Sequence, residues 1–474
     1  MAQQLEGAEQ AYNISGALRL KGKLDVTRLE EAFQSLVSRH ESFRISFHLI
    51  NGGVKQKVHE GLIIPLPLRE CPASQLKEQV ETFIHPFELT EAPLLRVGLF
   101  RVNEEDHVIV IDMHHIIADG KSVEIMLDEL MRLYKGETLP SLRIHYKDYA
   151  CWQEKRMETE VVQKQESYWM QKFSGDLPVL DLKTDYTRPA IQQYEGQHYS
   201  FELGKELTAQ LKSFMKNEGT TLYMTLMAAY HMLLHKYTGQ EDFVVGTPTA
   251  GRVHADLDTV VGMFVNTLAI RTTPKADQTI RSFVQEVKKA VLEAYEHQEY
   301  PFENLVDQLH LDRDLSRHPL FDTVLSVQVL TQEPFGLADL QTEPVSYNRP
   351  STKFDLSIEG SDLGNKVILS IEYAVSLFHE DSVKRFGKHF VQLIREMIGN
   401  PEGSLKDVSL LSSKEQATLS EISAYPKGDR IEDSVVTMLE EKIKGIERRP
   451  AVHSYNQQIN YTDLNQGANQ LAHF

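Results

Sequence analysis

The sequence predicts a mixed α/β fold that is built from more than one packed unit. Stretches with helical and with strand periodicity alternate along the chain, as in folds that pack helices against sheets. At 474 residues the chain exceeds one ordinary domain, and its hydrophobic fraction of 41% suffices for sizeable cores. No internal repeat with a period of about 20 to 50 residues is visible.

The first clear element is a helix that begins after Asp25, a residue type that caps helix N-termini. Its core face consists of apolar residues at helical spacing: Leu29, Phe33, Leu36 and Val37. The apolar run 108–111 then predicts a buried strand, and apolar spacing in 123–134 predicts a helix. Residues 113–120 therefore lie on a tight turn between strand and helix, where a rigid scaffold can hold catalytic side chains.

The later elements continue this alternation. Residues 165–175 predict a helix that closes a first unit, and the polar, proline-containing stretch 184–195 predicts a linker. Residues 222–237 are apolar on all sides, which predicts a helix buried against a sheet. Strands are expected at 243–245, 324–330 and 367–372.

The turn at 113–120 carries the residues best suited to chemistry. Two adjacent histidines, His114 and His115, are followed by Asp119 and Gly120. Histidine titrates near neutral pH, so one imidazole could accept and return a proton during catalysis. A pair of core histidines satisfied by backbone hydrogen bonds is an open alternative. A metal site is another, but it needs a third protein ligand at a recognisable spacing and none occurs nearby, so no metal is expected.

The turn resembles the signature of the condensation domains of nonribosomal peptide synthetases. Further stretches are similar to other motifs of that family and occur in the family's order: 39–47, 146–152, 261–271, 297–303 and 313–321. The resemblance extends through most of residues 3–420. The family's first motif is missing from the sequence, and Ala118, Lys121 and His318 stand where the family commonly has other residues.

This resemblance implies two lobes, each a chloramphenicol acetyltransferase-like sandwich of helices on a sheet, arranged as a V with a central tunnel. We expect the N-terminal lobe at residues 1–176 and the C-terminal lobe at 177–420. The sequence changes character after that point, and 459–472 looks like the opening of an adenylation domain. Residues 421–474 are interpreted as a linker and the truncated start of that domain.

The implied reaction is amide formation between two tethered thioesters. The amine of a downstream carrier-bound aminoacyl group attacks the thioester of an upstream carrier-bound aminoacyl or peptidyl group. The implied partners are upstream and downstream peptidyl carrier domains and an adjoining adenylation domain. No cofactor is expected to bind directly, because the substrates arrive on the phosphopantetheine of the carriers. Residues 39–47 and 261–271 resemble the subtype that joins an L-configured donor to an L-configured acceptor.

The family's pattern assigns the active imidazole to His115, either as a general base or as a group that orients the amine. His114 is expected to support the turn, and Gly120 to permit backbone geometry closed to other residues. Asp119 is expected to form an ion pair within the domain, because an unpaired charge between apolar elements is costly.

Four further residues lie in motifs that resemble the family's and are expected to support the site. Arg44 and Arg271 each flank an apolar, strand-like stretch, which favours a buried ion pair for either one. Of the two, Arg271 is favoured as the partner of Asp119. Asn266 and Tyr149 are expected to serve mainly in packing, with hydrogen bonds to backbone or substrate as the alternative.

Two alternative functions stay open. An epimerization domain of the same superfamily shares the histidine turn, although its downstream motifs differ from those of this chain. A catalytically inactive carrier-docking module is the second, although intact His115 and Asp119 argue against it. Heterocyclization domains replace the histidines by aspartates and are excluded by this sequence.

Composition excludes other classes of partner. The net charge of −18 gives an acidic surface that repels nucleic acid phosphates and anionic lipid. No apolar stretch approaches the length needed to span a bilayer. The only cysteines, Cys71 and Cys151, are too few for a disulfide framework. We therefore expect a cytoplasmic protein that binds neither nucleic acid nor membranes. The resemblance to condensation domains implies an enzyme of antibiotic or lipopeptide biosynthesis.

Overall fold

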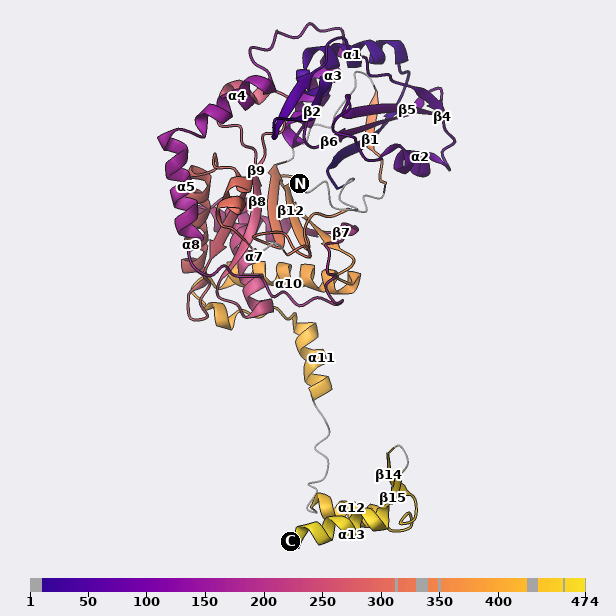
Figure 1. The fold of residues 1–474 in the computed structure, drawn as a ribbon, viewed down its shortest axis with the longest axis vertical. Coiled ribbons are helices and arrows are strands. Elements are labelled where there is room, and N and C mark those ends of the chain that lie inside the picture. The colour runs from indigo at the N-terminus through magenta and orange to yellow at the C-terminus, as the bar shows by residue number, and fades with distance from the viewer. Residues whose placement is uncertain are drawn as a thin grey trace. The chain divides into compact units, whose positions relative to one another are not determined.

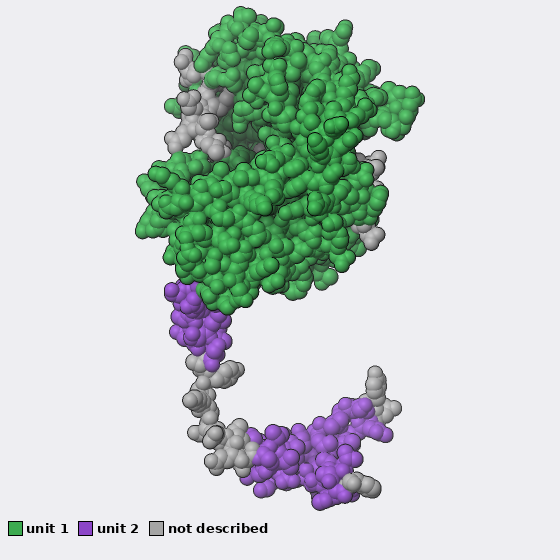
Figure 2. Space-filling view, turned by 90° about the vertical axis from the view of Figure 1, so that its left-hand side faces the viewer, with its two compact units in different colours: residues 1–410 green, residues 411–474 purple. Residues whose placement is uncertain are grey.

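The computed structural model describes residues 11–311, 314–329, 340–347, 351–423, 434–454 and 457–473. The chain divides into two compact units, residues 1–410 and 411–474 (Figure 2). Among the described residues, no helix is both long and apolar enough to cross a membrane.

The first lobe of unit 1 is organised around a five-stranded sheet in the order β11-β1-β6-β5-β4 (Figure 1). Helices α1 and α3 pack against each other beside it. In chain order its elements are β1 (Asn13–Lys21), α1 (Val26–Arg39), β2 (Ile45–Ile50), β3 (Gly53–Val58), β4 (Leu68–Glu70), α2 (Leu76–Phe83), β5 (Leu95–Asn103), β6 (Asp106–His114), α3 (Gly120–Tyr134) and, from far along the chain, β11 (Gln341–Pro344).

Local sequence explains the elements that lead to the histidine turn. The side chain of Asp25 accepts a hydrogen bond from the backbone N–H of Arg28 at 3.0 Å, so it caps α1 as expected. The central strand β6 is buried along nearly its whole length, since neighbours pair on both of its edges and side chains cover its faces. The predicted strand at 108–111 and helix at 123–134 are confirmed inside β6 and α3.

The second lobe is organised around a six-stranded mixed sheet in the order β7-β13-β12-β10-β8-β9. Helices α4 (Tyr146–Arg156) and α5 (Glu160–Lys172) connect the two lobes. In chain order the lobe contains β7 (Gly196–Leu203), α6 (Lys205–Glu218), α7 (Leu222–Thr238), β8 (Phe243–Thr249), β9 (Asn266–Thr272), α8 (Ile280–Glu296), α9 (Phe302–Gln308), β10 (Thr323–Val329), β12 (Leu356–Asp362), β13 (Val367–Ala374) and α10 (Glu380–Gly399).

Helix α7 confirms the prediction of a buried helix at 222–237. It packs against α8, α10 and β10, so apolar side chains are required on all of its sides. The mixed α/β class and the two sheets are also as the sequence predicts. The short strand β11 departs from a simple lobe order, because it follows β10 in the chain but pairs antiparallel with β1 of the first lobe.

Unit 2 is small. It contains α11 (Ser413–Ser423), α12 (Val435–Ile443), β14 (Pro450–Ser454), β15 (Gln457–Asn460) and α13 (Tyr461–Ala472). Neither α11 nor α13 has a buried residue, and α12 buries only Ile443. The described residues of this unit therefore lack a hydrophobic core of their own.

Candidate active site

The histidine turn joins the end of β6 to the start of α3. Strand β1 pairs antiparallel with β6 and places Asn13 opposite His114. The backbone N–H of His115 donates to the carbonyl oxygen of Tyr12 at 2.7 Å, which extends this pairing by one step into the turn. His115 is therefore held just beyond the end of the central strand β6 by a main-chain hydrogen bond to the residue that precedes β1.

The imidazole of His114 closes the turn. The ring Nδ1 accepts a hydrogen bond from the backbone N–H of Ile116 at 3.0 Å. The backbone carbonyl oxygen of His114 accepts a second one from the backbone N–H of Ile117 at 3.1 Å. The ring stacks on Tyr12 with centroids 6.4 Å apart and meets Phe87 edge-on. Burial lowers the pKa of His114 to about 4, and the neighbouring His115 acts in the same direction. These contacts fit a supporting residue.

His115 is only partly buried, whereas His114 is buried. Loss of hydration is the largest effect on its imidazole and lowers its pKa to about 4. The ammonium of Lys353 lowers that pKa further, while the carboxylate of Asp119 acts against the shift. At neutral pH the imidazole is therefore uncharged and can accept a hydrogen bond from an amine.

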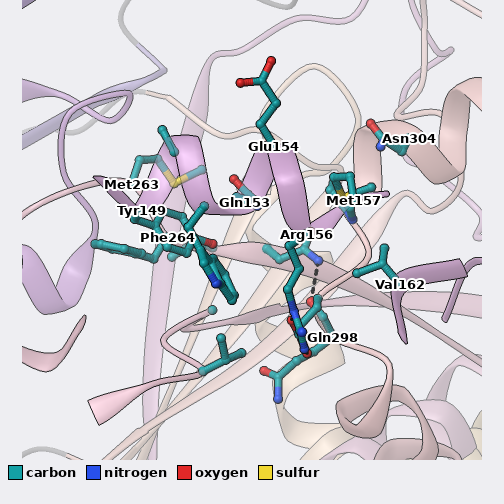
Figure 3. A pocket seen from close by; sticks show the side chains of 18 of the residues that line it. Tyr149, Gln153, Glu154, Arg156, Met157, Val162, Met263, Phe264, Gln298 and Asn304 are labelled. Atoms are coloured by element: carbon teal, nitrogen blue, oxygen red, sulfur yellow. Dashed lines mark hydrogen bonds and ion pairs between the residues drawn. The ribbon is translucent and has the colours of Figure 1, made fainter. Parts of the chain in front are cut away.

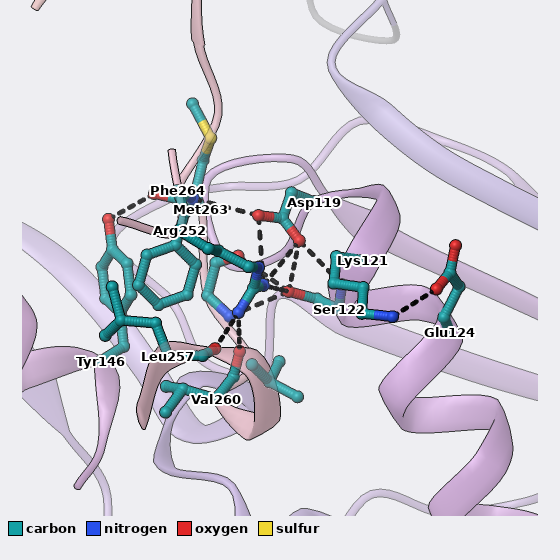
Figure 4. A network of polar contacts seen from close by, with 12 residues as sticks. Asp119, Lys121, Ser122, Glu124, Tyr146, Arg252, Leu257, Val260, Met263 and Phe264 are labelled. Carbon is teal, nitrogen blue, oxygen red and sulfur yellow. Dashed lines mark hydrogen bonds and ion pairs between the residues drawn. The ribbon is translucent and has the colours of Figure 1, made fainter. Parts of the chain in front are cut away.

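Asp119 fixes the other end of the turn (Figure 4). It caps α3, because its Oδ1 accepts from the backbone N–H of Ser122 at 2.7 Å and lies 2.7 Å from the Ser122 hydroxyl. Its Oδ2 accepts from the backbone N–H of Phe264 at 3.2 Å, in the segment before β9. The carboxylate is only 1% exposed, so these contacts replace its lost hydration.

Arg252 is the ionic partner of Asp119. Its Nη2 lies 3.0 Å from Asp119 Oδ1, and its side chain is 4% exposed. Its Nη1 donates to the carbonyl oxygens of Leu257 and Val260, and its guanidinium lies 4.2 Å from the ring centroid of Phe264. The pair therefore ties the start of α3 to the segment between β8 and β9, across the two lobes.

The predicted partners of Asp119 are wrong. Arg271 instead pairs with Asp242 at 2.6 Å, because β9 carries it five residues beyond Asn266, about 17 Å along the strand and away from the turn. Within the described residues Arg44 pairs with no carboxylate, and its guanidinium donates to backbone carbonyl groups instead. These belong to Val37, Ser38 and His59, at 2.7–3.2 Å.

Arg252 has only a weak signal in the sequence. It follows Gly251 in a loop with no apolar pattern, outside every motif that resembles the family's. The backbone oxygen of Phe264 lies 1.8 Å from where a Cβ of Gly251 would stand, and φ there is +63°, so only glycine fits this close approach. The position of Arg252 directly after this glycine was the available sequence clue to its role as the partner of Asp119.

The expectation for Gly120 is also wrong. It is the first residue of α3, its φ lies outside the left-handed region, and nothing lies within 4 Å of an added Cβ. Backbone geometry therefore does not require glycine at this position.

Asn266 and Tyr149 support the segment that contacts Asp119, rather than Asp119 itself. The Nδ2 of Asn266 donates to the carbonyl oxygens of Gln298 and Tyr300 at 2.8 Å, and its Oδ1 accepts from Phe302, which fixes the start of β9. The ring of Tyr149 packs on Phe264 with centroids 4.7 Å apart.

A cavity of about 380 Å³ lies beside these residues (Figure 3). Its walls come from α4, the segment before β9 and the start of α9. Phe264 both lines this cavity and covers Arg252, so the cavity borders the network that holds Asp119.

Metal ligands do not gather in the part of the chain that the structure describes: it holds no group of three or more His, Cys, Asp or Glu residues that could bind an ion. The arrangement found at the turn instead presents an uncharged imidazole beside a buried, paired carboxylate. Such a site can orient an amine and move its proton.

Known proteins are similar to this chain in sequence and in fold. The Condensation domain family matches residues 1–420. The chain is 43% identical to tyrocidine synthase 3 of Brevibacillus parabrevis and 42% identical to surfactin synthase subunit 2 of Bacillus subtilis (strain 168), each over 99% of the chain. It spans only 7% and 13% of the lengths of those two proteins.

Solved structures agree. The X-domain in its complex with OxyB from teicoplanin biosynthesis matches with a TM-score of 0.79 at 27% identity, over 87% of this chain and 93% of that one. A four-domain nonribosomal peptide synthetase bound to AMP and glycine shares the fold, with a TM-score of 0.83 at 22% identity over 100% of this chain and 38% of that one. The family match over residues 1–420 shows that the chain belongs to the condensation-domain family, which forms peptide bonds in nonribosomal peptide synthetases.

Proposed function

We propose that this chain joins an upstream carrier-bound aminoacyl or peptidyl thioester to the amine of a downstream carrier-bound aminoacyl thioester, with His115 at the reaction centre. The observation that carries the proposal is the position of His115. It lies on a turn fixed on one side by the Tyr12 carbonyl and on the other by the buried Asp119–Arg252 pair. Both substrates bring their own phosphopantetheine arm.

The electrostatics of His115 favour orientation over full deprotonation of a free amine. An imidazole with a pKa of about 4 is a much weaker base than an α-amine, whose pKa is about 8. We infer that His115 accepts a hydrogen bond from the uncharged amine. It takes the proton as the N–C bond forms, because the nitrogen becomes acidic at that point. The C–S bond then breaks, and the thiolate of the donor arm receives the proton.

Holding the two arms together supplies the larger share of the rate in this proposal. Proximity and orientation can contribute about 7–11 kcal/mol, against roughly 10²–10⁴-fold from acid–base help. A cavity of about 570 Å³ supports an approach between the lobes, since β1 and α2 of the first lobe line it together with β7, β12 and β13 of the second. A recess on one face of unit 1 is visible in Figure 2. A V-shaped domain with a continuous tunnel is part of this proposal.

The finer assignments also remain proposals. Residues 39–47 and 261–271 support the subtype with an L-configured donor and acceptor. We assign residues 1–176 and 177–420 to the two condensation lobes. Residues 421–474 are assigned to a linker and the start of an adenylation domain. Exposed apolar residues on α12 and α13 support this last assignment, because the rest of such a domain would cover them: Val435, Val436 and Leu471. The cytoplasm is the proposed location.

Peptide formation with both carriers loaded tests the proposal. We expect His115→Ala to lower the condensation rate by roughly 10²-fold or more, because it removes the proton acceptor. Circular dichroism should show an unchanged fold, since the backbone contacts of His115 do not need its ring. A well-folded His115→Ala variant that condenses at the wild-type rate would remove His115 from the mechanism.

The same assay separates the alternatives. Inversion of a carrier-bound residue without peptide formation would identify an epimerization domain. Carrier binding without any product would identify a docking module. Intact His115 and a fully partnered Asp119 favour the catalytic assignment over the docking one.

A further inference from the structure

Lys353 brings a positive charge from the second lobe to the histidine turn. It lies just before β12, and its Nζ is 4.5 Å from the ring centroid of Tyr12. Tyr12 stacks on His114 through its ring and accepts the His115 N–H through its carbonyl oxygen. The ammonium therefore rests on the residue that contacts both histidines.

This ammonium has few partners to balance it. Within the described residues its Nζ forms no hydrogen bond and no ion pair, and Glu372 is the carboxylate that acts on it from β13. Burial lowers the pKa of Lys353 to about 8. Enclosing an ammonium without a paired carboxylate costs stability, so packing alone gives no reason for a lysine here.

The cavity between the lobes gives the charge a place to act. Lys353 lines this cavity of about 570 Å³ together with Asn13, whose Oδ1 is buried without a hydrogen-bond partner in the described part of the chain. A donor and an acceptor are thus both available on the wall next to the histidine turn.

We propose that Lys353 is a positioning residue for peptide bond formation: its ammonium, resting on Tyr12, keeps the imidazoles of the histidine turn unprotonated, so that His115 can accept a hydrogen bond from the incoming amine. A nearby cation disfavours a second positive charge, and this effect is strong where water is excluded. The inference rests on the role of His115 in the proposed function. It adds that the second lobe controls the charge state of a residue on the first.

Other charged groups face this site and enter the balance. Asp119 and His114 face His115 from its own turn. Glu303 and Tyr194 act on Tyr12. Further titratable groups line the cavity around Lys353: Glu81 on α2, His198 on β7, Glu359 on β12, Glu372 on β13 and Tyr347. A second cation, Arg96 on β5, lies over the ring of Phe87, which meets His114 edge-on. The carboxylates favour protonated imidazoles, and Lys353 lowers the pKa of both histidines.

A purely structural role is the competing explanation. Lys353 could hold the lobes together through its contact with the Tyr12 ring and have no effect on protonation. The two explanations differ for a variant that removes the charge, Lys353→Gln, and for one that keeps it, Lys353→Arg. Lys366→Gln is the matched control, because Lys366 belongs to the same lobe but pairs with Glu202 at the surface.

Histidine titration of the whole chain tests the charge directly. Histidine labelled with ¹³C in the ring would be followed by NMR from about pH 8 to about pH 5, where free imidazoles titrate. The His115 signal is identified by its loss in His115→Gln. We expect this signal to stay unprotonated in the wild type, Lys353→Arg and Lys366→Gln. In Lys353→Gln its titration should shift upward into this range.

Condensation rates with loaded carriers provide the second measurement. The ratio of wild-type to Lys353→Gln rates should grow as pH falls from about 8 to about 6, because the variant's His115 becomes protonated. A ratio that is constant with pH, or a His115 titration unchanged in Lys353→Gln, would overturn the inference. The titration needs no turnover, so it fails or succeeds independently of the His115→Ala test of the proposed function.

Discussion

At the scale of single residues, the Asp119–Arg252 pair sets the geometry of the histidine turn. Asp119 combines a helix cap, a backbone contact to Phe264 and a buried ion pair. Arg252 adds two carbonyl contacts and the face of Phe264. Removing one member leaves the other buried and unpaired, which is the costly case for an ion pair.

Arg252→Gln should therefore lower the free energy of unfolding by roughly 3–5 kcal/mol, as measured by urea denaturation. Arg271→Gln is the matched control. Its partner Asp242 has a side chain that is 38% exposed and can be hydrated, so the loss should be much smaller. Equal losses in the two variants would show that Asp119 does not depend on Arg252.

At the scale of elements, buried strands and helices form the site and exposed ones lie outside it. Strand β6 delivers the histidines, β1 holds them, and α3 begins at the end of the turn. Helices α12 and α13 are the opposite case. Both helices are amphipathic, but their apolar side chains are exposed to solvent. Their tertiary contacts are few. Local stability follows such contacts, so these helices should open most easily.

Limited proteolysis with trypsin tests this difference. We expect the first cuts within 434–473, where α12 and its surroundings offer several basic residues that no proline follows: Lys442, Lys444 and Arg448. Helix α10 is the internal control, because it carries Lys384 and Lys388 but packs on α7. If mass spectrometry shows cuts in α10 as early as in 434–473, the tail belongs to a folded unit.

At the scale of the whole molecule, buried histidines make the stability depend on pH. Burial lowers the pKa of four of them to about 4: His114, His115, His231 and His318. A histidine whose pKa is depressed in the folded state stabilises that state above its unfolded pKa of about 6.5. This stabilisation is lost as pH falls from about 6.5 to about 4. Burial raises the pKa of Asp112 to about 6 and also raises that of Asp322, so these two carboxyl groups act in the opposite direction but are fewer.

The melting temperature should therefore fall as pH is lowered from about 7 to about 5. His318→Asn removes one of the four histidines, so its melting temperature should fall less over the same range. The ring of His318 stacks on Phe321 with centroids 4.4 Å apart, and asparagine would lose this contact at every pH. The wild type and His318→Asn should therefore be compared by the slope of their melting temperature against pH. A wild-type melting temperature that is flat or rises on acidification would contradict the prediction.

The sequence by itself determined the class of fold, the buried helix α7, the strand–turn–helix at residues 113–120 and the family. Each of these depends on the order of residues within a short stretch. Apolar spacing predicted α1 and α7, and the close spacing of His114, His115 and Asp119 predicted the turn and its chemistry.

Only the tertiary structure decided which distant groups meet that turn. Arg252 and Lys353 reach it from loops of the second lobe, with no periodic pattern to mark them. Arg271 and Arg44 had the stronger sequence signal but lie elsewhere, because the direction of β9 and the end of α1 fix their places. The physical reason is that side-chain spacing along a chain reports one element at a time. The partner of a buried charge depends on how the lobes pack.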